Sequence, residues 1–141
     1  MIQKIEYQHV DGYKGYKPIV TPLAFDGDYF TGIWFTSDNV GYLSGYNGGI
    51  YKTVDGGKSW TTLYKKNHLF QKRVHFNDIL FTNENVGYVI GENGLCMKTF
   101  NAGKSWSLIK MNTQNTLLGL FYYNGTVYIT SVDGQYFEIK D

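Results

Sequence analysis

Residues 35–60 and 81–106 are two copies of one sequence pattern. The first copy reads FTSDNVGYLSGYNGGIYKTVDGGKSW, and the second reads FTNENVGYVIGENGLCMKTFNAGKSW. Trp60 and Trp106, which end the two copies, lie 46 residues apart. A fixed period in the forties is typical of repeat architectures, and with a strand-forming composition it predicts the blades of a β-propeller.

The second copy predicts four short strands joined by turns. Asn93-Gly94 is a strong signal for a tight hairpin, because both residues accept the positive φ that such a turn requires. The expected strands are Val74–Thr82, Val86–Gly91, Leu95–Phe100 and Trp106–Met111. Four antiparallel strands make one propeller blade. In the first copy Asn47-Gly48 takes the place of the Asn93-Gly94 turn.

The fold class expected is therefore all-β, with about three blades in a single β-propeller-type domain over residues 1–141. Outside the two full repeats, Tyr7–Tyr16 aligns with Tyr51–Trp60, and a shortened third copy follows the second. The expected units are a partial blade at 1–27, blades at 28–64 and 74–111, and a partial blade at 118–141.

About three blades are too few to close a ring, since known propellers have roughly 4–8. Open sheet edges also invite association. We expect the ring to be completed either by oligomerisation or by missing sequence. In the first case an N-terminal strand of one chain completes the last blade of another, and two chains form a six-bladed ring.

A second motif lies inside the repeat, at the turn before each tryptophan. Both turns fit the pattern [ST]-x-[DN]-x-G-x-[ST]-W, which resembles the Asp-box, also called the BNR repeat. The matching residues are Thr53, Asp55, Gly57, Ser59 and Trp60 in the first turn, and Thr99, Asn101, Gly103, Ser105 and Trp106 in the second.

The physical role of this turn is structural. The Asp or Asn side chain accepts hydrogen bonds from backbone N–H groups within the turn. The glycine adopts a conformation closed to other residues, and the indole buries a large apolar area. Asp55 is therefore interpreted as a turn brace, and Trp60 and Trp106 as packing residues.

The whole repeat resembles the photosystem II stability/assembly factor family. The resemblance covers residues 28–111 well and 112–141 weakly. It implies a non-catalytic protein-binding scaffold, typically outside the cytoplasm. The photosynthetic members use an Arg-rich patch, whereas this chain has one arginine, Arg73. This composition argues against a photosystem role.

The alternative is a carbohydrate-binding or sialidase-derived module, because Asp-boxes also occur in sialidases. A sialidase binds the substrate carboxylate with three arginines, whose planar donors fit that group. Arg73 alone cannot build that site, so we expect no enzyme and no catalytic residue. Two exposed aromatic side chains flanking polar groups in one cleft would instead favour glycan binding.

Metal and cofactor sites are not expected. His9, His68 and His75 lack metal-ligand spacing, and His75 is interpreted as a structural histidine. The glycines fall at hairpin turns rather than in a phosphate loop. Cys96, the single cysteine, has apolar neighbours and is expected to be a buried, unreactive thiol.

The candidate partner-binding residues lie in a loop between blades and in two hairpin turns. Such loops carry function more often than cores do, although a plain solvated connector is the alternative. The loop contributes Lys65, Lys66, His68, Phe70, Lys72 and Arg73, and the turns contribute Tyr46 and Glu92. We expect both turns to open on the same face as this loop.

Charge and hydropathy limit the partners further. The net charge of +1 gives no long-range attraction to nucleic acid or anionic membranes, and no apolar run approaches the ~20 residues of a membrane span. We therefore expect a protein partner and self-association, with a glycan as the other possibility. The start of the sequence lacks a signal peptide, whereas the family resemblance favours an extracytoplasmic location.

Overall fold

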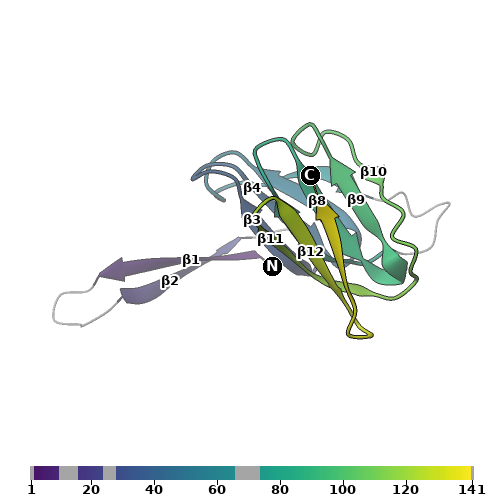
Figure 1. Cartoon of the computed structure of the whole chain (residues 1–141). Coiled ribbons are helices and arrows are strands. Elements are labelled where there is room, and N and C mark those ends of the chain that lie inside the picture. The colour runs from purple at the N-terminus through teal and green to yellow at the C-terminus, as the bar shows by residue number, and fades with distance from the viewer. Residues whose placement is uncertain (1, 10–15, 24–27, 66–73, 141) are drawn as a thin grey trace.

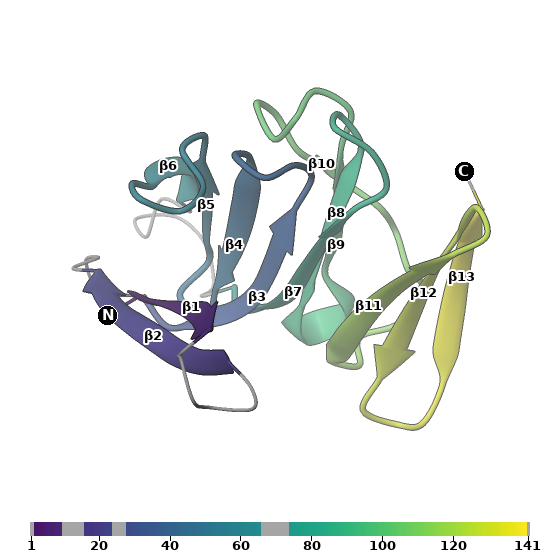
Figure 2. The ribbon, with the colours of Figure 1, turned by 90° about the vertical axis from the view of Figure 1, so that its left-hand side faces the viewer.

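The computed structural model describes residues 2–9, 16–23, 28–65 and 74–140. These residues form four antiparallel sheets, two of them with four strands. Figure 2 shows the three larger sheets standing side by side, as the blades of a propeller do. The predicted all-β array of propeller blades is confirmed. No helix in these ranges is long and apolar enough to cross a membrane.

Blade 1 consists of four strands in the order β3-β4-β5-β6. Their bounds are β3 Phe30–Phe35, β4 Gly41–Gly45, β5 Gly49–Thr53 and β6 Thr61–Lys65. Blade 2 repeats this order with β7 Phe76–Phe81, β8 Gly87–Gly91, β9 Cys96–Thr99 and β10 Ser107–Leu108, and a short 3-10 turn, η1 Glu92–Gly94, joins β8 to β9.

Blade 3 has three strands in the order β11-β12-β13. Their bounds are β11 Leu117–Tyr123, β12 Thr126–Ser131 and β13 Tyr136–Lys140. The fourth sheet is a hairpin of β1 Ile2–His9 and β2 Tyr16–Leu23, paired from Ile2↔Leu23 to His9↔Tyr16. In Figure 1 this hairpin projects away from the stacked blades.

Two strand-level expectations differ from the structure. The expected last strand of blade 2, Trp106–Met111, shortens to Ser107–Leu108, because the chain then leaves the sheet to reach blade 3. The two Asn-Gly turns also differ. Asn93 and Gly94 both have positive φ (56° and 69°), whereas only Gly48 does in the first copy. Asn93-Gly94 therefore forms a two-residue hairpin loop, whereas in the first copy Gly48 follows the turn.

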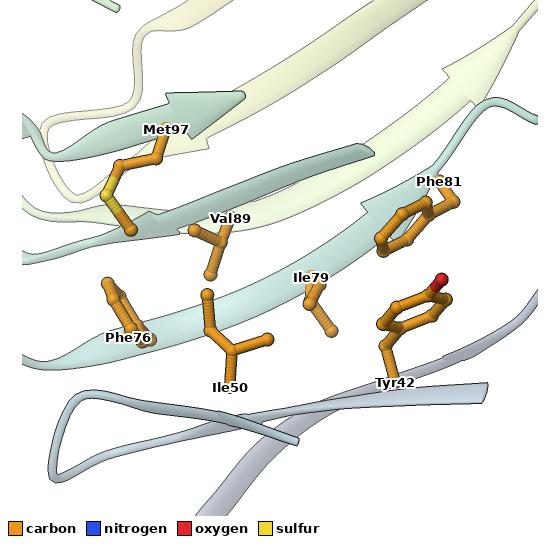
Figure 3. Packing of buried hydrophobic residues seen from close by; sticks show 7 residues of the cluster. All are labelled: Tyr42, Ile50, Phe76, Ile79, Phe81, Val89 and Met97. Carbon is orange, nitrogen blue, oxygen red and sulfur yellow. The ribbon is translucent and has the colours of Figure 1, made fainter. Parts of the chain in front are cut away.

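Two apolar cores lie between the blades. The first is filled from blades 1 and 2 by Tyr42, Ile50, Phe76, Ile79, Phe81, Val89 and Met97. Figure 3 shows the Tyr42 ring against that of Phe81, and the two stack with centroids 3.9 Å apart. The second core joins blades 2 and 3 through Leu80, Tyr88, Ile90, Cys96, Leu117, Val127 and Ile129. Burial raises the pKa of the Cys96 thiol to about 12.

Hydrogen bonds at a repeated β-bulge tie neighbouring blades together. The first strand of each blade is bulged, and in blades 1 and 2 the bulged residues are Thr31 and Asn77. Thr31 Oγ1 donates to the Phe76 carbonyl at 2.8 Å, and Asn77 Nδ2 donates to the Leu117 carbonyl at 2.8 Å. The same register position thus holds blade 2 to blade 1 and blade 3 to blade 2.

A partly buried carboxylate adds a third tie. Asp78 Oδ2 accepts the Leu120 N–H at 2.8 Å, and Oδ1 accepts its neighbour Ile79 N–H at 2.9 Å. Burial raises the pKa of Asp78, and these two hydrogen bonds oppose that rise. A Cβ at Gly32 would lie 2.7 Å from Asp78 Oδ1, so glycine leaves room for this contact between blades.

Candidate functional site

The first Asp-box turn is organised by one buried hydroxyl and one exposed carboxylate. Thr53 Oγ1 accepts the Gly57 N–H at 2.9 Å and donates to Asp55 Oδ1 at 2.8 Å. Asp55 Oδ1 also accepts the Ser59 N–H at 2.9 Å, and Ser59 Oγ donates to Asp55 Oδ2 at 2.5 Å. Both carboxylate oxygens are therefore engaged inside the turn.

The second Asp-box turn repeats this network with an amide in place of the carboxylate. Thr99 Oγ1 accepts the Gly103 N–H at 2.9 Å, and Asn101 Oδ1 accepts the Ser105 N–H at 2.9 Å. Asn101 Nδ2 then donates to Ser105 Oγ at 2.8 Å, the reverse of the serine-to-carboxylate bond in the first turn. The two side chains thus support the same turn with opposite donor direction.

Hydrogen bonding lowers the pKa of Asp55 to about 2, chiefly through the hydroxyl and then the backbone N–H of Ser59. A carboxyl group with so low a pKa is ionised at neutral pH and is a poor general acid. Trp60 and Trp106 pack edge-on against Phe35 and Phe81, with centroids 6.2 Å apart in both pairs. These contacts stabilise the turn and offer no reactive group.

A different cluster forms where the hairpin turns of blades 1 and 2 meet. The imidazole of His75 stacks on the ring of Tyr46, with centroids 3.9 Å apart and an interplanar angle of 17°. His75 Nδ1 lies 2.6 Å from the Tyr46 carbonyl oxygen, and since a carbonyl only accepts, Nδ1 is the donor. Nε2 then faces Glu92 Oε2 at 3.9 Å.

The backbone holds this cluster in place. The Glu92 N–H donates to the His75 carbonyl at 3.1 Å, and the Tyr46 N–H donates to the Tyr29 carbonyl at 2.6 Å. Tyr46 remains 39% exposed, while the side chain of His75 is mostly covered and that of Glu92 is 35% exposed. We call Tyr46, His75 and Glu92 the turn cluster.

A buried carboxylate supports the turn cluster from below. Asp28 Oδ1 accepts the Asn47 N–H at 2.7 Å, and Asp28 Oδ2 accepts the Tyr51 hydroxyl at 2.6 Å. Burial, together with Asp28, raises the pKa of Tyr51, so this phenol stays a donor. A Cβ at Gly45 would lie 2.0 Å from Asp28, which explains a glycine at that position.

A pocket of about 660 Å³ adjoins Glu92. It lies between the second hairpin turn and the segment that leads from β10 to blade 3. Its apolar lining comes from Val74, Leu95, Cys96, Leu108, Ile109 and Met111, and its polar lining from Glu92, Asn93, Lys110, Asn112, Thr113 and Gln114. The pocket is thus lined by both apolar side chains and polar or charged ones.

The structure brings together two of the residues that the sequence singled out for partner binding. Tyr46 and Glu92 both contact His75 and so share one face, which we call the turn face. Lys65 is exposed at the end of β6. The remaining candidates, Lys66, His68, Phe70, Lys72 and Arg73, lie outside the described residues.

His75 was not among the residues expected to bind a partner. The stacking partner of His75 is 29 positions away, in the preceding blade, so only the packing of the blades reveals the contact. Within the described ranges, no group of three or more His, Cys, Asp or Glu side chains is arranged to hold a metal ion.

Repeated four-stranded blades with Asp-box turns define the chain as part of an Asp-box β-propeller. Residues 21–122 match the family model described as photosynthesis system II assembly factor YCF48, and the chain belongs to this family. No curated protein matches the chain.

Among the solved structures that share the fold, two are YCF48 proteins. One is YCF48 bound to D1 peptide, with 23% identity and a TM-score of 0.68 over 81% of this chain and 38% of that chain. The other is YCF48 from Cyanidioschyzon merolae, with 20% identity and a TM-score of 0.63 over 83% of this chain and 35% of that chain. The chain therefore spans little more than a third of either structure.

Proposed function

We propose that this chain is a non-catalytic protein-binding scaffold and that the partner binds at the turn face. The observation that carries the proposal is the turn cluster. An exposed tyrosine ring is held on a histidine beside a partly exposed glutamate, and backbone hydrogen bonds fix all three. Tyrosine, whose rigid aromatic ring carries a polar hydroxyl, is typical of binding hot spots.

The pocket beside Glu92 adds a place for an apolar side chain of the partner. Its volume of about 660 Å³ falls in the range of ligand sites. A relative with the same fold has been solved with a peptide bound, which supports a peptide segment as the ligand class here. The partner we propose is thus an extended protein segment with an apolar anchor.

Two carboxylates of the described residues, Asp55 and Asp28, are engaged in structural contacts. Asp55 has both oxygens engaged within its turn, and Asp28 is buried against a backbone N–H and a phenol. Neither carboxylate is free to take a proton from a substrate. The sequence has one arginine, Arg73, whereas a sialidase site needs three to bind its substrate carboxylate.

A display library of random peptides, panned on the immobilised chain, tests the proposal. We expect enriched peptides whose affinity falls at least tenfold, about 1.4 kcal/mol, in Tyr46→Ala and in Glu92→Arg. Phe100→Ala is the matched control, because Phe100 is 65% exposed on the Asp-box turn at the opposite end of the strands. Peptides that bind all three variants equally would place the site elsewhere, and no enrichment would contradict the proposal.

The alternative, a carbohydrate-binding module, has weaker support in the described residues. It calls for two aromatic side chains in one cleft, and the 660 Å³ pocket is lined by none. Exposed tyrosines such as Tyr46 and Tyr29 favour it. A glycan array separates the two, because the scaffold proposal predicts no hits, and Tyr46-dependent glycan binding would replace it.

A further inference from the structure

Blade 3 leaves one face of its sheet uncovered. On one side of β12, Val127 and Ile129 are fully buried against blade 2. On the other side, the cross-strand neighbours Phe121 and Tyr128 point away from blade 2, as does Tyr136. Phe121 is 62% exposed and Tyr136 is 65% exposed. We call the side of a blade that turns toward the next blade its trailing face, and the opposite side its leading face.

The register of the strands shows what this trailing face corresponds to. Phe121 pairs with Tyr128 as Leu80 pairs with Tyr88 in blade 2 and as Trp34 pairs with Tyr42 in blade 1. In both earlier blades these positions pack into the core shared with the following blade. The aromatic residues of blade 3 therefore occupy positions whose equivalents in blades 1 and 2 both contact the following blade.

The opposite end of the array offers the complementary surface. In blade 2 the leading-face residues Ile79 and Phe81 are 1% and 2% exposed, because they pack against blade 1. Their equivalents in blade 1, 46 residues earlier, are Ile33 and Phe35, which are 59% and 40% exposed. Leu43, the cross-strand partner of Ile33 on the same leading face, is already buried, so the open part of this face lies along β3, which carries Ile33 and Phe35.

We propose that the trailing face of blade 3 docks on the leading face of blade 1 in a second copy of the chain. The contact reproduces the one between blades 1 and 2, where Tyr42 stacks on Phe81 with an interplanar angle of 19°. Tyr128 takes the place of Tyr42, and Phe35 of the other copy takes the place of Phe81. This inference does not depend on which partner the turn face binds.

Such a contact is heterologous, since it joins two different surfaces, and it forms a ring when the rotation closes. Three blades from each of two copies make six, within the range of known propellers. A dimer that satisfies both contacts at once is therefore the assembly we expect.

The charge of Glu138 indicates that the association is weak and that a substitution can strengthen it. Lys52 and Lys98 lie over the rings of Tyr42 and Tyr88 at 5.3 and 5.0 Å, but the equivalent residue in blade 3 is Glu138. Lys52 shares a small pocket with Glu84 of blade 2, whose equivalent in blade 1 is Asp38. Docking thus brings Glu138 near Asp38 of the other copy, which places two negative charges together. Glu138→Lys replaces them by a pair of opposite charges, as between Lys52 and Glu84.

Light scattering during size-exclusion chromatography, with the whole chain loaded at about 0.1–1 mM so that micromolar association is populated, tests the proposal. We expect a mass near twice the 16.2 kDa of one chain. Phe121→Glu should weaken association at least tenfold. Glu138→Lys should strengthen it about two- to fivefold, the size of an exposed charge pair. Phe100→Glu, at a 65% exposed residue on the Asp-box turn of blade 2, is the matched control and should leave the association unchanged.

A photo-crosslinker in place of Phe35 identifies the surface directly. We expect crosslinks between chains that map to β11–β13, and their loss in the Phe121→Glu background. Monomer at every concentration would overturn the proposal, and so would a dimer that Phe121→Glu leaves intact. Crosslinks between chains that avoid β11–β13 would equally overturn it.

Discussion

The Thr99 hydroxyl is the group on which the second Asp-box turn most depends. Thr99 is fully buried, and its Oγ1 accepts the Gly103 N–H at 2.9 Å and the Asn101 N–H at 3.3 Å while donating to Asn101 Oδ1 at 3.0 Å. Thr99→Val keeps the shape of the side chain and removes all three interactions. The buried Gly103 N–H is then left without its acceptor.

The expected cost follows from that unpaired donor. A buried N–H without a partner costs about 1–3 kcal/mol, and the longer Asn101 N–H bond adds a fraction of that. We therefore expect Thr99→Val to lower the free energy of unfolding by about 2–3 kcal/mol. That is a large share of the roughly 5–15 kcal/mol of an ordinary domain.

Urea unfolding followed by tryptophan fluorescence measures this cost. Thr53→Val removes the same hydroxyl from the first turn, where the Gly57 N–H bond is also 2.9 Å. Because this hydroxyl also donates to the ionised Asp55, Thr53→Val should cost at least as much as Thr99→Val. Thr61→Val is the control, because its exposed hydroxyl makes only a 3.3 Å bond to a carbonyl, and it should cost less than about 0.5 kcal/mol.

The reasoning is refuted if Thr99→Val unfolds at the same urea concentration as the Thr61→Val control. Thr99→Ser keeps the test open if the valine variant does not fold. Serine retains the hydroxyl and loses one methyl group, which costs about 0.8 kcal/mol. A serine variant as unstable as the valine variant would show that packing, and not the hydroxyl, stabilises the turn.

Three further predictions concern single positions in the two full repeats. The pKa of Asp55 is lowered from 3.8 to about 2, so its contribution to stability is present above pH 4 and is lost as the pH falls toward 2. The urea midpoint should therefore fall less between pH 5 and pH 2.5 in Asp55→Asn than in the unaltered protein, and an equal fall in both proteins would contradict this. Trp106 Nε1 donates to a carbonyl at 3.1 Å, whereas Trp60 Nε1 is buried with no partner among the described residues. In urea unfolding, Trp106→Phe should therefore cost about 1 kcal/mol more than Trp60→Phe, and the opposite order would count against the hydrogen bond. A Cβ at Gly87 would lie 2.6 Å from the buried Phe81 ring, whereas a Cβ at Gly41 would lie 2.7 Å from the Phe35 ring, which is 40% exposed and so less confined. Gly87→Ala should therefore cost about 1–3 kcal/mol and Gly41→Ala clearly less, and equal thermal stabilities of the two variants would contradict this difference.

Short-range signals predict the blades well and the contacts between blades poorly. The strands of the two full repeats follow from the 46-residue repeat and from the turns that separate them. The turn geometry does not follow, because Asn47-Gly48 and Asn93-Gly94 have the same two residues and different φ angles. In blade 2 the Gly94 N–H bonds to the Asn115 carbonyl, so that turn is also shaped by the segment leading to blade 3.

In the candidate site, too, short-range signals predict some residues, and only the packing of the blades reveals the others. Tyr46 and Glu92 were expected on one face because equivalent turns of neighbouring blades end at the same side. The role of His75 could not be predicted, because its ring meets Tyr46 only once the blades are stacked. Asp28 likewise shows no motif, and its support of the turn depends on the Tyr51 hydroxyl in another strand.

The bulged position of the first strand connects the fold to the proposed association. Thr31 and Asn77 each donate a hydrogen bond to the next blade, and the residue at this position in blade 3 is Leu118, which is 50% exposed. A polar side chain here needs an acceptor on a following blade, since an unpaired donor is costly once buried. Leucine needs only an apolar surface. Blade 3 thus keeps the blade-docking shape of its neighbours while replacing their hydrogen bond by apolar area, which suits contact with a separate chain as well as with a continuous one.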